Sequence, residues 1–468
     1  MLINGHWITS SQSATIPDRF DDSLAGSYHL ADAAQVETAV AGSFAAFQQT
    51  RRLSAHERSQ LLQRIARGIE IRSADFVDLI IREAGKPIDL AQAEVLRASQ
   101  TFAFAAQEAL RDTGEILAID ASPAGKNHTG LTRRFPIGLI FGITPFNFPL
   151  NLVAHKVAPA LATGNTILIK PALKTPLTAL LLGEVLVDAG ILPGQVNILP
   201  FHHDLIPPLE TDPRIAMISF TGSAEIGWAL KSRAARKRIC LELGGNAALI
   251  IHRDADWQPR LAAIASAAFG YAGQSCISVQ RLLIHADLYD EVRSALVAYV
   301  KEKVRSGDPR EKGVLVGPMI DTAACDKIVA WIDTALAAGA KSLLPLERKK
   351  NVLFPVLLEN VPPNLPIACE EAFAPVVVLE KYLDFDEAIA RVNASRYGLQ
   401  AGVFTRDLTL AWQAYRELEV GSVLINQTPT FRVENMPYGG VKDSGFGREG
   451  VRYAMEEMTE LKSLIFQH

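Results

Sequence analysis

The chain has 468 residues, of which 49% are hydrophobic and 21% charged, a composition typical of folded multidomain proteins and not of disordered ones. Its formal net charge of −4 provides no global positive field, so we expect neither a nucleic acid nor a membrane as a partner. The four cysteines, Cys240, Cys276, Cys325 and Cys369, show no metal-ligand spacing and are too few for a disulfide framework, which indicates a reducing compartment and no metal site.

The N-terminal part of the chain is predicted to be helical. Its first residues, MLINGHWITSSQ, lack the basic and apolar segments of a signal peptide, so we expect a cytoplasmic location. From about residue 33 to residue 107, apolar residues such as Leu61, Ile65 and Ile69 recur at helical spacing. Residues 115–120 and 129–135 then alternate around a turn-forming Ser-Pro-Ala-Gly-Lys-Asn segment, which predicts a projecting β-hairpin.

After Pro136 the sequence changes to short apolar strands alternating with helices, the pattern of a parallel α/β sheet. The expected strands are Ile137–Ile143, Thr166–Lys170, Val196–Leu199, Ile215–Phe220 and Ile239–Leu243. One expected helix spans Leu150–Leu161, and another begins with Thr175 as its N-cap and Pro176 in its first turn. A second α/β set follows from about residue 247 to residue 426, with helices around Leu261–Tyr271, Leu288–Val304, Ala323–Ala338 and Leu410–Leu418. The fold class is therefore α/β, with two open parallel sheets and a β-hairpin arm.

Two glycine-containing segments are candidates for binding a dinucleotide. The G-x-G-x-x-G segment Gly445–Gly450 has no strand before it and no room for a βαβ unit after it, so we reject it. The turn Thr221-Gly222-Ser223 follows a predicted strand and opens a helix whose N–H groups can face a pyrophosphate. Because small residues open many such helices, this turn alone is a weak indication.

Three polar residues form a candidate reaction centre. Cys276 lies in a loop between a buried helix and a strand, although an isolated cysteine is more often an inert small hydrophobe. Glu242 interrupts an apolar strand, where burial would raise its pKa and make it a base near neutrality; local backbone N–H groups satisfying the carboxylate are the alternative. Asn147 follows a predicted strand, where ligands of α/β sheets collect, unless it only bonds its own turn. A thiol, an amide donor, a carboxylate base and a dinucleotide turn are together what aldehyde oxidation requires.

Motifs over nearly the whole chain resemble the NAD(P)-dependent aldehyde dehydrogenase superfamily. They are Ile3–Trp7, Thr144–Pro149, Gly164–Pro171, Phe220–Ser223, Glu242–Gly245, Gly273–Cys276, Glu370–Phe373 and Pro437–Gly450, in this order. The resemblance implies a cofactor-binding domain of residues 1–112 and 137–244, a catalytic domain of residues 245–449, and an oligomerisation arm of residues 113–136 and 450–468. It also implies a homodimer or a homotetramer.

The resemblance assigns roles to individual residues. Cys276 is implied to attack the aldehyde, the Asn147 amide and the Cys276 N–H to hold the oxyanion of the thiohemiacetal, and Glu242 to activate the water that hydrolyses the thioester. The implied cofactor is NAD or NADP, and no metal is needed. The implied cofactor-binding residues are Thr144, Pro145, Phe146, Lys170, Ala172, Leu173, Lys174, Gly222, Ser223, Leu243, Glu371 and Phe373.

Departures from the family pattern leave the cofactor preference open. NAD-preferring relatives often have a glutamate three residues after the lysine at position 170, where this chain has Leu173 followed by Lys174. A carboxylate at that position would repel a 2′-phosphate, so its absence admits NADP. The loop Pro200–Asp204 and Ala374 also differ from the usual motifs, which can alter cofactor affinity without changing the chemistry.

The substrate is expected to be a small aldehyde. The segments Phe146–Asn151 and Thr430–Tyr438 look most like subfamilies that oxidise short hydroxylated or anion-bearing aldehydes, such as lactaldehyde or phosphonoacetaldehyde. Arg97, His155 and Arg432 are candidate ligands for an anionic tail, with structural ion pairs as the alternative. Two rival functions are a CoA-acylating aldehyde dehydrogenase, against which a water-activating Glu242 argues, and a catalytically silent oligomeric binding protein of the same fold.

Overall fold

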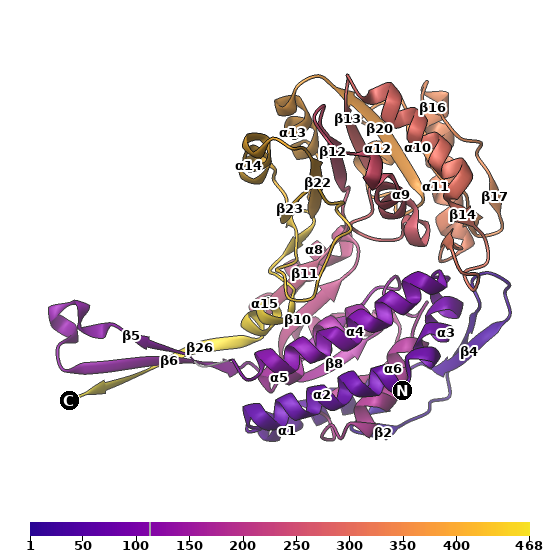
Figure 1. Cartoon of the computed structure of the whole chain (residues 1–468). Coiled ribbons are helices and arrows are strands. Elements are labelled where there is room, and N and C mark those ends of the chain that lie inside the picture. The colour runs from indigo at the N-terminus through magenta and orange to yellow at the C-terminus, as the bar shows by residue number, and fades with distance from the viewer. Residues whose placement is uncertain (112–113) are drawn as a thin grey trace.

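The computed structural model describes residues 1–111 and 114–468, and within them the chain forms two α/β bodies and one projecting arm (Figure 1). Each body is built on its own largely parallel sheet, which confirms the predicted fold class. The predicted boundary between residues 112 and 113 lies outside the described residues.

The first body contains a sheet with the strand order β2-β1-β9-β8-β7-β10-β11-β25. Its strands are β1 (Leu2–Ile3), β2 (His6–Trp7), β7 (Leu139–Ile143), β8 (Thr166–Lys170), β9 (Val196–Ile198), β10 (Ile215–Thr221), β11 (Arg238–Glu242) and β25 (Gly445–Phe446). The strands from β9 to β11 in this order run parallel, and β25 pairs antiparallel with β11. The rejected G-x-G-x-x-G segment thus begins as an edge strand next to Glu242.

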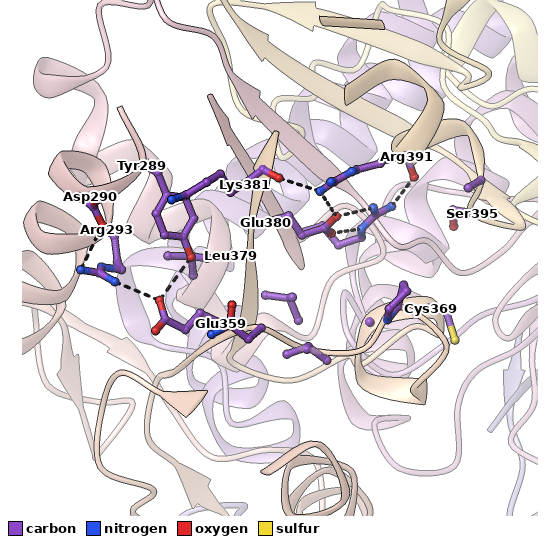
Figure 2. Close-up of a pocket in the computed structure, with 17 residues that line it drawn as sticks. Tyr289, Asp290, Arg293, Glu359, Cys369, Leu379, Glu380, Lys381, Arg391 and Ser395 are labelled. Atoms are coloured by element: carbon purple, nitrogen blue, oxygen red, sulfur yellow. Dashed lines mark hydrogen bonds and ion pairs between the residues drawn. The ribbon is translucent and has the colours of Figure 1, made fainter. Parts of the chain in front are cut away.

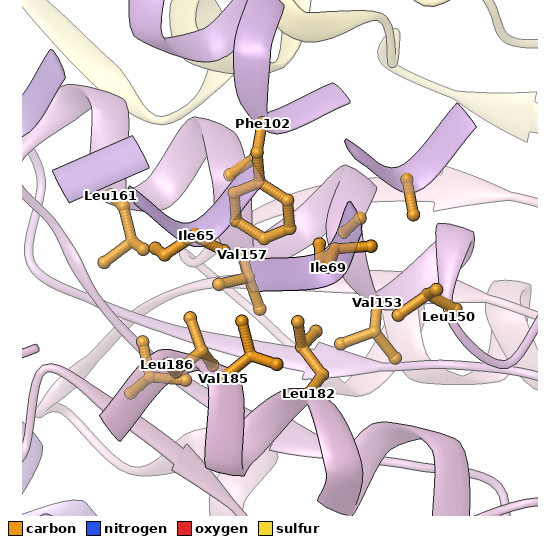
Figure 3. Close-up of a cluster of buried hydrophobic side chains, with 14 of the residues drawn as sticks. Ile65, Ile69, Phe102, Leu150, Val153, Val157, Leu161, Leu182, Val185 and Leu186 are labelled. Atoms are coloured by element: carbon orange, nitrogen blue, oxygen red, sulfur yellow. The ribbon is translucent and has the colours of Figure 1, made fainter. Parts of the chain in front are cut away.

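Helices cover both faces of this sheet. They are α1 (Ala33–Thr50), α2 (Ala55–Ile71), α3 (Ser73–Ala84), α4 (Ile88–Glu108), α5 (Asn151–Thr163), α6 (Leu177–Asp188), α7 (Ile206–Thr211), α8 (Ala224–Arg233) and α15 (Val451–Glu457). Helices α2, α4, α5 and α6 pack into one core in which Ile65, Phe102 and Val157 are completely buried (Figure 3). Burying each such side chain stabilises the fold by about 1.5–3 kcal/mol. Because α5 is buried along its whole length, its apolar sequence reflects a core helix, and the described residues contain no helix long and apolar enough to cross a membrane.

The start of α6 differs from its prediction. Pro176 precedes the first residue of the helix, and no side chain caps its N-terminus. The Thr175 hydroxyl instead donates to the carbonyl of Phe146 at 3.2 Å. The predicted N-cap is therefore wrong, because Thr175 bonds the loop after β7 in preference to its own helix.

The second body contains a sheet with the order β16-β19-β20-β13-β12-β22-β23. These strands are β12 (Ala248–Ile251), β13 (Arg281–His285), β16 (Lys341–Ser342), β19 (Val356–Glu359), β20 (Val376–Tyr382), β22 (Gln400–Phe404) and β23 (Ser422–Ile425). The helices are α9 (Leu261–Phe269), α10 (Tyr289–Lys303), α11 (Thr322–Ala337), α12 (Pro366–Cys369), α13 (Phe385–Asn393) and α14 (Leu408–Glu417). The helix predicted to reach Tyr271 ends at Phe269, because the next residues leave the helical conformation.

Short paired strands complete the two bodies. They are β3 (Ser13–Pro17) with β4 (Leu24–His29), β14 (Arg305–Ser306) with β15 (Val314–Val316), β17 (Arg348–Lys349) with β18 (Val352–Leu353), and β21 (Tyr397–Gly398) with β24 (Val441–Lys442).

The arm is a sheet of β5 (Glu115–Leu117), β6 (His128–Pro136) and β26 (Thr459–Gln467), which projects away from both bodies with the C-terminus near its end (Figure 1). The first predicted hairpin strand ends at Leu117 because 3₁₀ turns follow it at Ile119–Ala121 and Pro123–Gly125. Within the C-terminal segment assigned to the arm, α15 packs on α4 and α5, whereas β26 pairs with β6. The assembly role of the arm stays a prediction.

Candidate active site

A cavity of about 280 Å³ lies at the carboxyl ends of β7, β10 and β11, opposite the loop that precedes β13. It brings together thirteen residues predicted from the sequence: Arg97, Pro145, Phe146, Asn147, His155, Gly222, Ser223, Glu242, Leu243, Cys276, Glu371, Phe373 and Arg432. Of the four cysteines, Cys276 alone lines it. Thr221, from the predicted dinucleotide turn, also lines the cavity. The remaining lining residues have no individual role predicted from the sequence, namely Phe148, Asn151, Leu152, Gly244, Ser275, Ile277, Tyr438 and Glu449.

The loop that carries Cys276 is held in an unusual backbone conformation. Tyr271 and Ala272 both have φ of 54°, and Gly273 has φ of 67°. Non-glycine residues in this left-handed region cost about 1–3 kcal/mol each and persist where surrounding contacts fix them. A Cβ atom at Gly273 would lie 2.1 Å from the Ala374 carbonyl oxygen, so the turn requires glycine. Buried Gln274 supports the turn, accepting from the Ile320 N–H at 2.8 Å.

Asn147 lies in the loop after β7, close to the cysteine loop. Its Nδ2 donates to the Gln274 carbonyl at 3.1 Å, and its second amide hydrogen remains available. Within the described part of the chain, the Cys276 backbone N–H has no hydrogen-bond acceptor. The two donors therefore offer hydrogen bonds to an oxygen bound next to the Cys276 sulfur.

The Asn147 loop is anchored by a buried ion pair between Lys86 and Glu94. Glu94 accepts the backbone N–H groups of Leu150 and Asn151 at 3.0 and 3.2 Å. The Lys86 ammonium lies 3.6 Å from the ring centroid of Phe148 and also faces the Tyr271 ring. The pair thus joins the N-terminal helices to both reactive loops, a contact that no local sequence pattern predicts.

Glu242 ends β11 inside the cavity and is 3% exposed. Neither of its carboxylate oxygens has a hydrogen-bond partner among the described residues. Burial, and next the negative charge of Glu449, hold the pKa of Glu242 well above its usual range. The alternative of a carboxylate satisfied by local backbone N–H groups is therefore wrong, and Glu242 becomes a proton acceptor as the pH rises.

Cys276 is half-buried, and burial of its thiol raises the pKa to about 12. The Tyr438 hydroxyl lies 3.1 Å from its sulfur and opposes this shift, as does the positive charge of Arg432. Glu371 and Glu242 act in the other direction. In this environment the thiol needs local stabilisation to ionise.

The predicted anion ligands share one end of the cavity with two carboxylates. Arg97 Nε donates to Glu434 at 2.7 Å, and His155 lies between Glu434 and Arg432, with Nε2 to Glu434 at 2.5 Å and Nδ1 to Arg432 at 2.9 Å. Arg432 also pairs with Glu449 at 3.3 Å. The structural ion pairs considered as the alternative are thus present, while terminal guanidinium nitrogens of Arg97 have no partner within the described ranges.

The charges at this end do not balance. Burial raises the pKa of Glu434, but His155 and the two guanidinium groups outweigh it and hold that pKa well below its usual range. Burial likewise opposes ionisation of Glu449, whereas Lys156, 3.1 Å away, and His155 keep its pKa low. Arg97, Arg432 and Lys156 therefore face two ionised carboxylates, which leaves an excess positive charge before His155 is counted.

The opposite end of the cavity has features that fit a dinucleotide. Ser223 precedes α8 without capping it, so the helix N–H groups are open to an anion, and the buried Thr221 hydroxyl lacks a partner among the described residues. The Phe146 and Phe373 rings meet edge to face at 5.8 Å between centroids. Glu371 accepts from the Gly245 N–H at 2.9 Å, and burial raises its pKa to about 7.

Five predicted cofactor residues do not line this cavity, namely Thr144, Lys170, Ala172, Leu173 and Lys174. The Thr144 N–H donates to the Lys170 carbonyl at 3.2 Å, which places both at the carboxyl end of the sheet. Burial lowers the pKa of Lys170 to about 8, and no carboxylate in the described chain pairs with its ammonium. Lys174 instead pairs with Asp321 at 2.6 Å, so its charge is already partly neutralised.

A larger cavity, of about 740 Å³, lies in the second body and shares no residue with the Cys276 cavity (Figure 2). Its arginines pair with neighbouring carboxylates, Arg281 with Glu380 at 2.7 Å and Arg293 with Glu359 at 3.2 Å. A cysteine, Cys369, also lines this cavity, but the carboxylates Glu359 and Glu380 there are paired with arginines, unlike Glu242, so size alone does not identify the reaction centre.

Comparison with known proteins agrees with this geometry. The model of the aldehyde dehydrogenase family matches residues 7–464, which confirms the resemblance seen in the motifs. The 3-sulfolactaldehyde dehydrogenase of Priestia aryabhattai is 37% identical over 469 residues, covering 99% of this chain and 97% of its own.

Solved structures show the same fold. Aldehyde dehydrogenase 21 from Physcomitrella patens, in complex with the reaction product succinate, is 39% identical with a TM-score of 0.97, covering 100% of this chain and 97% of its own. The NADP-dependent glyceraldehyde-3-phosphate dehydrogenase from Bacillus halodurans, complexed with NADP, is 34% identical with a TM-score of 0.96, covering 100% and 98% respectively.

Proposed function

Because the chain belongs to the aldehyde dehydrogenase family and is an NAD(P)-dependent oxidoreductase of aldehydes, we propose that its substrate is a short aldehyde with an anionic tail, oxidised to the carboxylic acid at Cys276. One observation carries the proposal. The cavity that holds Cys276, Asn147 and Glu242 is also lined by Arg97 and Arg432, which together with the buried Lys156 outnumber the carboxylates Glu434 and Glu449 that they contact.

The first chemical step forms a bond between the Cys276 sulfur and the aldehyde carbon. The thiol loses its proton to solvent, the thiolate attacks, and the carbonyl electrons move onto the aldehyde oxygen. The Asn147 amide and the Cys276 N–H donate to that oxyanion. Bound NAD(P)⁺ supplies the hydride acceptor that allows this adduct to become a thioester.

The second step is hydrolysis of the thioester. Glu242 accepts a proton from a water molecule, the resulting hydroxide attacks the thioester carbon, and the acid leaves as the thiol reforms. Both carboxylate oxygens are unpartnered among the described residues, so the group is free to hold a water. A base in this position favours release of a free acid over transfer to CoA.

The dinucleotide would be held at the other end of the cavity. Gly222, Ser223 and the N-terminus of α8 would face the pyrophosphate, Lys170 the adenosine ribose, and Glu371 the nicotinamide ribose. The unpaired Lys170 ammonium and the apolar Leu173 supply no negative charge against a 2′-phosphate. NADP⁺ is therefore accepted as well as NAD⁺.

The anionic tail would bind between Arg97 and Arg432, with His155 between them. Their guanidinium groups form charge-assisted hydrogen bonds with carboxylate, sulfonate or phosphate oxygens. The three relatives support this substrate class, since the sulfolactaldehyde, succinate and glyceraldehyde 3-phosphate for which they are named or with which they were solved all carry an anionic group.

The arm would join copies of the chain. Ile116, Leu131 and Leu464 stand opposite one another on adjacent strands and are 87%, 36% and 50% exposed. An apolar row of this kind on a projecting sheet is typical of a protein interface. The two bodies would then serve as cofactor-binding and catalytic domains of each protomer in a homodimer or homotetramer.

The proposal is tested by following reduced nicotinamide over short aldehydes of matched length, with a neutral, carboxylate or sulfonate end, and with NAD⁺ and NADP⁺ side by side. Cys276→Ala is the control and should abolish turnover. We expect kcat/KM to be highest for an anionic aldehyde. A preference for the neutral aldehyde of equal length would refute the substrate class, and turnover that requires CoA would refute release of a free acid.

A further inference from the structure

Tyr438, to which the sequence assigns no role, makes the only side-chain hydrogen bond to the Cys276 sulfur within the described chain, at 3.1 Å. We propose that its hydroxyl is the donor that stabilises the Cys276 thiolate, and that Arg432, lying over its ring, strengthens this donor. The inference rests on the proposed function only for the attack of the thiolate on an aldehyde. Ionisation of the thiol itself needs neither aldehyde nor dinucleotide.

The position of Tyr438 is fixed from three sides. Its backbone forms a reciprocal bridge with Glu449, with N–H to oxygen distances of 2.9 and 2.7 Å. Its ring packs with Ile277 and Leu399 and is 3% exposed. The Arg432 guanidinium lies 3.6 Å from the ring centroid. The hydroxyl therefore cannot swing away from the sulfur without breaking packed contacts.

The phenol can act only as a donor to an ionised sulfur. Burial, and next the neighbouring thiol, hold the pKa of Tyr438 well above its usual range, so its hydrogen stays on the oxygen. A thiolate is a pure acceptor, which makes the O–H to sulfur bond stronger after the thiol has lost its proton to solvent. Of the other charged groups around Cys276, Arg432 favours ionisation, whereas Glu371 and Glu242 oppose it.

Arg432 acts on the donor through the ring face. A cation over an aromatic ring is attracted by the electron density of that face, and by withdrawing this density it makes the hydroxyl a better donor. Arg432 is itself held by His155 and Glu449, so its place over the ring is set by the same network that faces the substrate tail. The residue that recognises the anion is thereby coupled to the residue that stabilises the nucleophile.

The bond matters most before the attack, when the whole negative charge lies on the sulfur. When the sulfur bonds to the aldehyde carbon, the negative charge moves from sulfur to the aldehyde oxygen, which Asn147 and the Cys276 N–H hold. The thioester sulfur that follows carries no charge for Tyr438 to stabilise. Loss of the hydroxyl should therefore slow formation of the adduct, and it should slow hydrolysis only through the charge that returns to the sulfur as the acid leaves.

The test is alkylation of Cys276 by iodoacetamide over neutral to alkaline pH in Tyr438→Phe, which keeps the ring under Arg432. A hydrogen bond to a charged group predicts alkylation about tenfold slower at a given pH, with the pH profile displaced upward. Tyr415→Phe, at a tyrosine that is 65% exposed, is the matched control and should alkylate at the wild-type rate. Equal rates for Tyr438→Phe and the wild type would overturn the proposal.

A second variant has the opposite sign. Site-specific 3-fluorotyrosine at position 438 makes the hydroxyl a stronger donor at almost the same size, so alkylation should become faster; slower or unchanged alkylation would count against the donor role. Arg432→Met should slow alkylation less in the Tyr438→Phe background than in the wild type, and equal slowing in both would overturn the part assigned to Arg432. If the wild type were inactive on every aldehyde but Tyr438→Phe still slowed alkylation, the proposed function would be refuted and the role of Tyr438 would stand.

Discussion

Replacing Arg97 by glutamine separates binding of a substrate anion from support of the fold. Arg97 lies on α4 and lines the cavity, and its Nε donates to Glu434 at 2.7 Å while its terminal nitrogens have no partner among the described residues. Glu434 keeps hydrogen bonds from His155 and Thr101 when Arg97 is removed. The structural disturbance should therefore be small, and the main loss should be contacts to the bound anion.

The expected magnitude follows from the contacts that Arg97 can make. One hydrogen bond to a charged group contributes about 1.5–3 kcal/mol. The side chain is 27% exposed, so solvent screens part of this, and we take about 2 kcal/mol for the whole loss. Since each 1.36 kcal/mol is tenfold, kcat/KM for an anionic aldehyde should fall by about 30-fold. The neutral aldehyde of equal length should change by less than about twofold.

The assay compares kcat/KM for the two aldehydes in the wild type, Arg97→Gln and Arg97→Lys. The lysine variant keeps the charge but loses the planar fork, so it should fall between the other two. Arg67→Gln, at an exposed arginine on α2, is the control for loss of a charge elsewhere. An equal fall for both aldehydes would show that Arg97 acts only through Glu434, and no fall for either would remove it from the substrate site.

Three further predictions concern hydrolysis, cofactor choice and assembly. Glu242→Gln should form one equivalent of reduced cofactor per site and then turn over about 100-fold or more slowly than the wild type. Because the pKa of Glu242 is raised, hydrolysis in the wild type should accelerate with rising pH. Stopped-flow traces of the variant should lack both the steady rate that follows the burst and this acceleration. Leu173→Glu should raise KM for NADP⁺ about tenfold relative to KM for NAD⁺, because the introduced carboxylate repels the 2′-phosphate. Equal changes of the two KM values in initial-rate assays would contradict the placement of residue 173 next to the adenosine ribose. Leu464→Asp combined with Ile116→Asp should convert the oligomer to monomers in light scattering, an expectation that a monomeric wild type would refute.

The parts of the fold that the sequence predicts are those governed by local pattern. Strand β8 has its predicted bounds because its five consecutive buried residues lie between a glycine-containing turn and Pro171. The prediction for Thr175 was wrong because a threonine before a helix has several acceptors within reach, and the carbonyl of Phe146 becomes available only after the chain has folded.

The candidate site shows the same division between local and distant information. Cys276, Asn147 and Glu242 each interrupt a local pattern of the sequence. They can therefore be identified as candidate site residues from this sequence without an alignment. Tyr438 is separated from Cys276 by 162 residues and carries no local signal, since a tyrosine in a glycine-rich loop has no pattern to interrupt. Pairings of this kind form only when folding brings distant segments of the chain together.

The distribution of charge in the molecule bears on how an anionic aldehyde would be recognised. The whole chain carries a formal charge of −4, whereas the substrate end of the cavity has an excess of positive charge. The net charge of the protein therefore does not attract an anionic aldehyde from solution. Beyond about 8 Å, physiological salt also screens the field of the cavity arginines. Discrimination must arise after entry, from hydrogen bonds to Arg97 and Arg432. Added salt should then change kcat/KM for an anionic aldehyde much less than loss of Arg97 does, because the arginine acts at contact distance and the net charge of the protein does not.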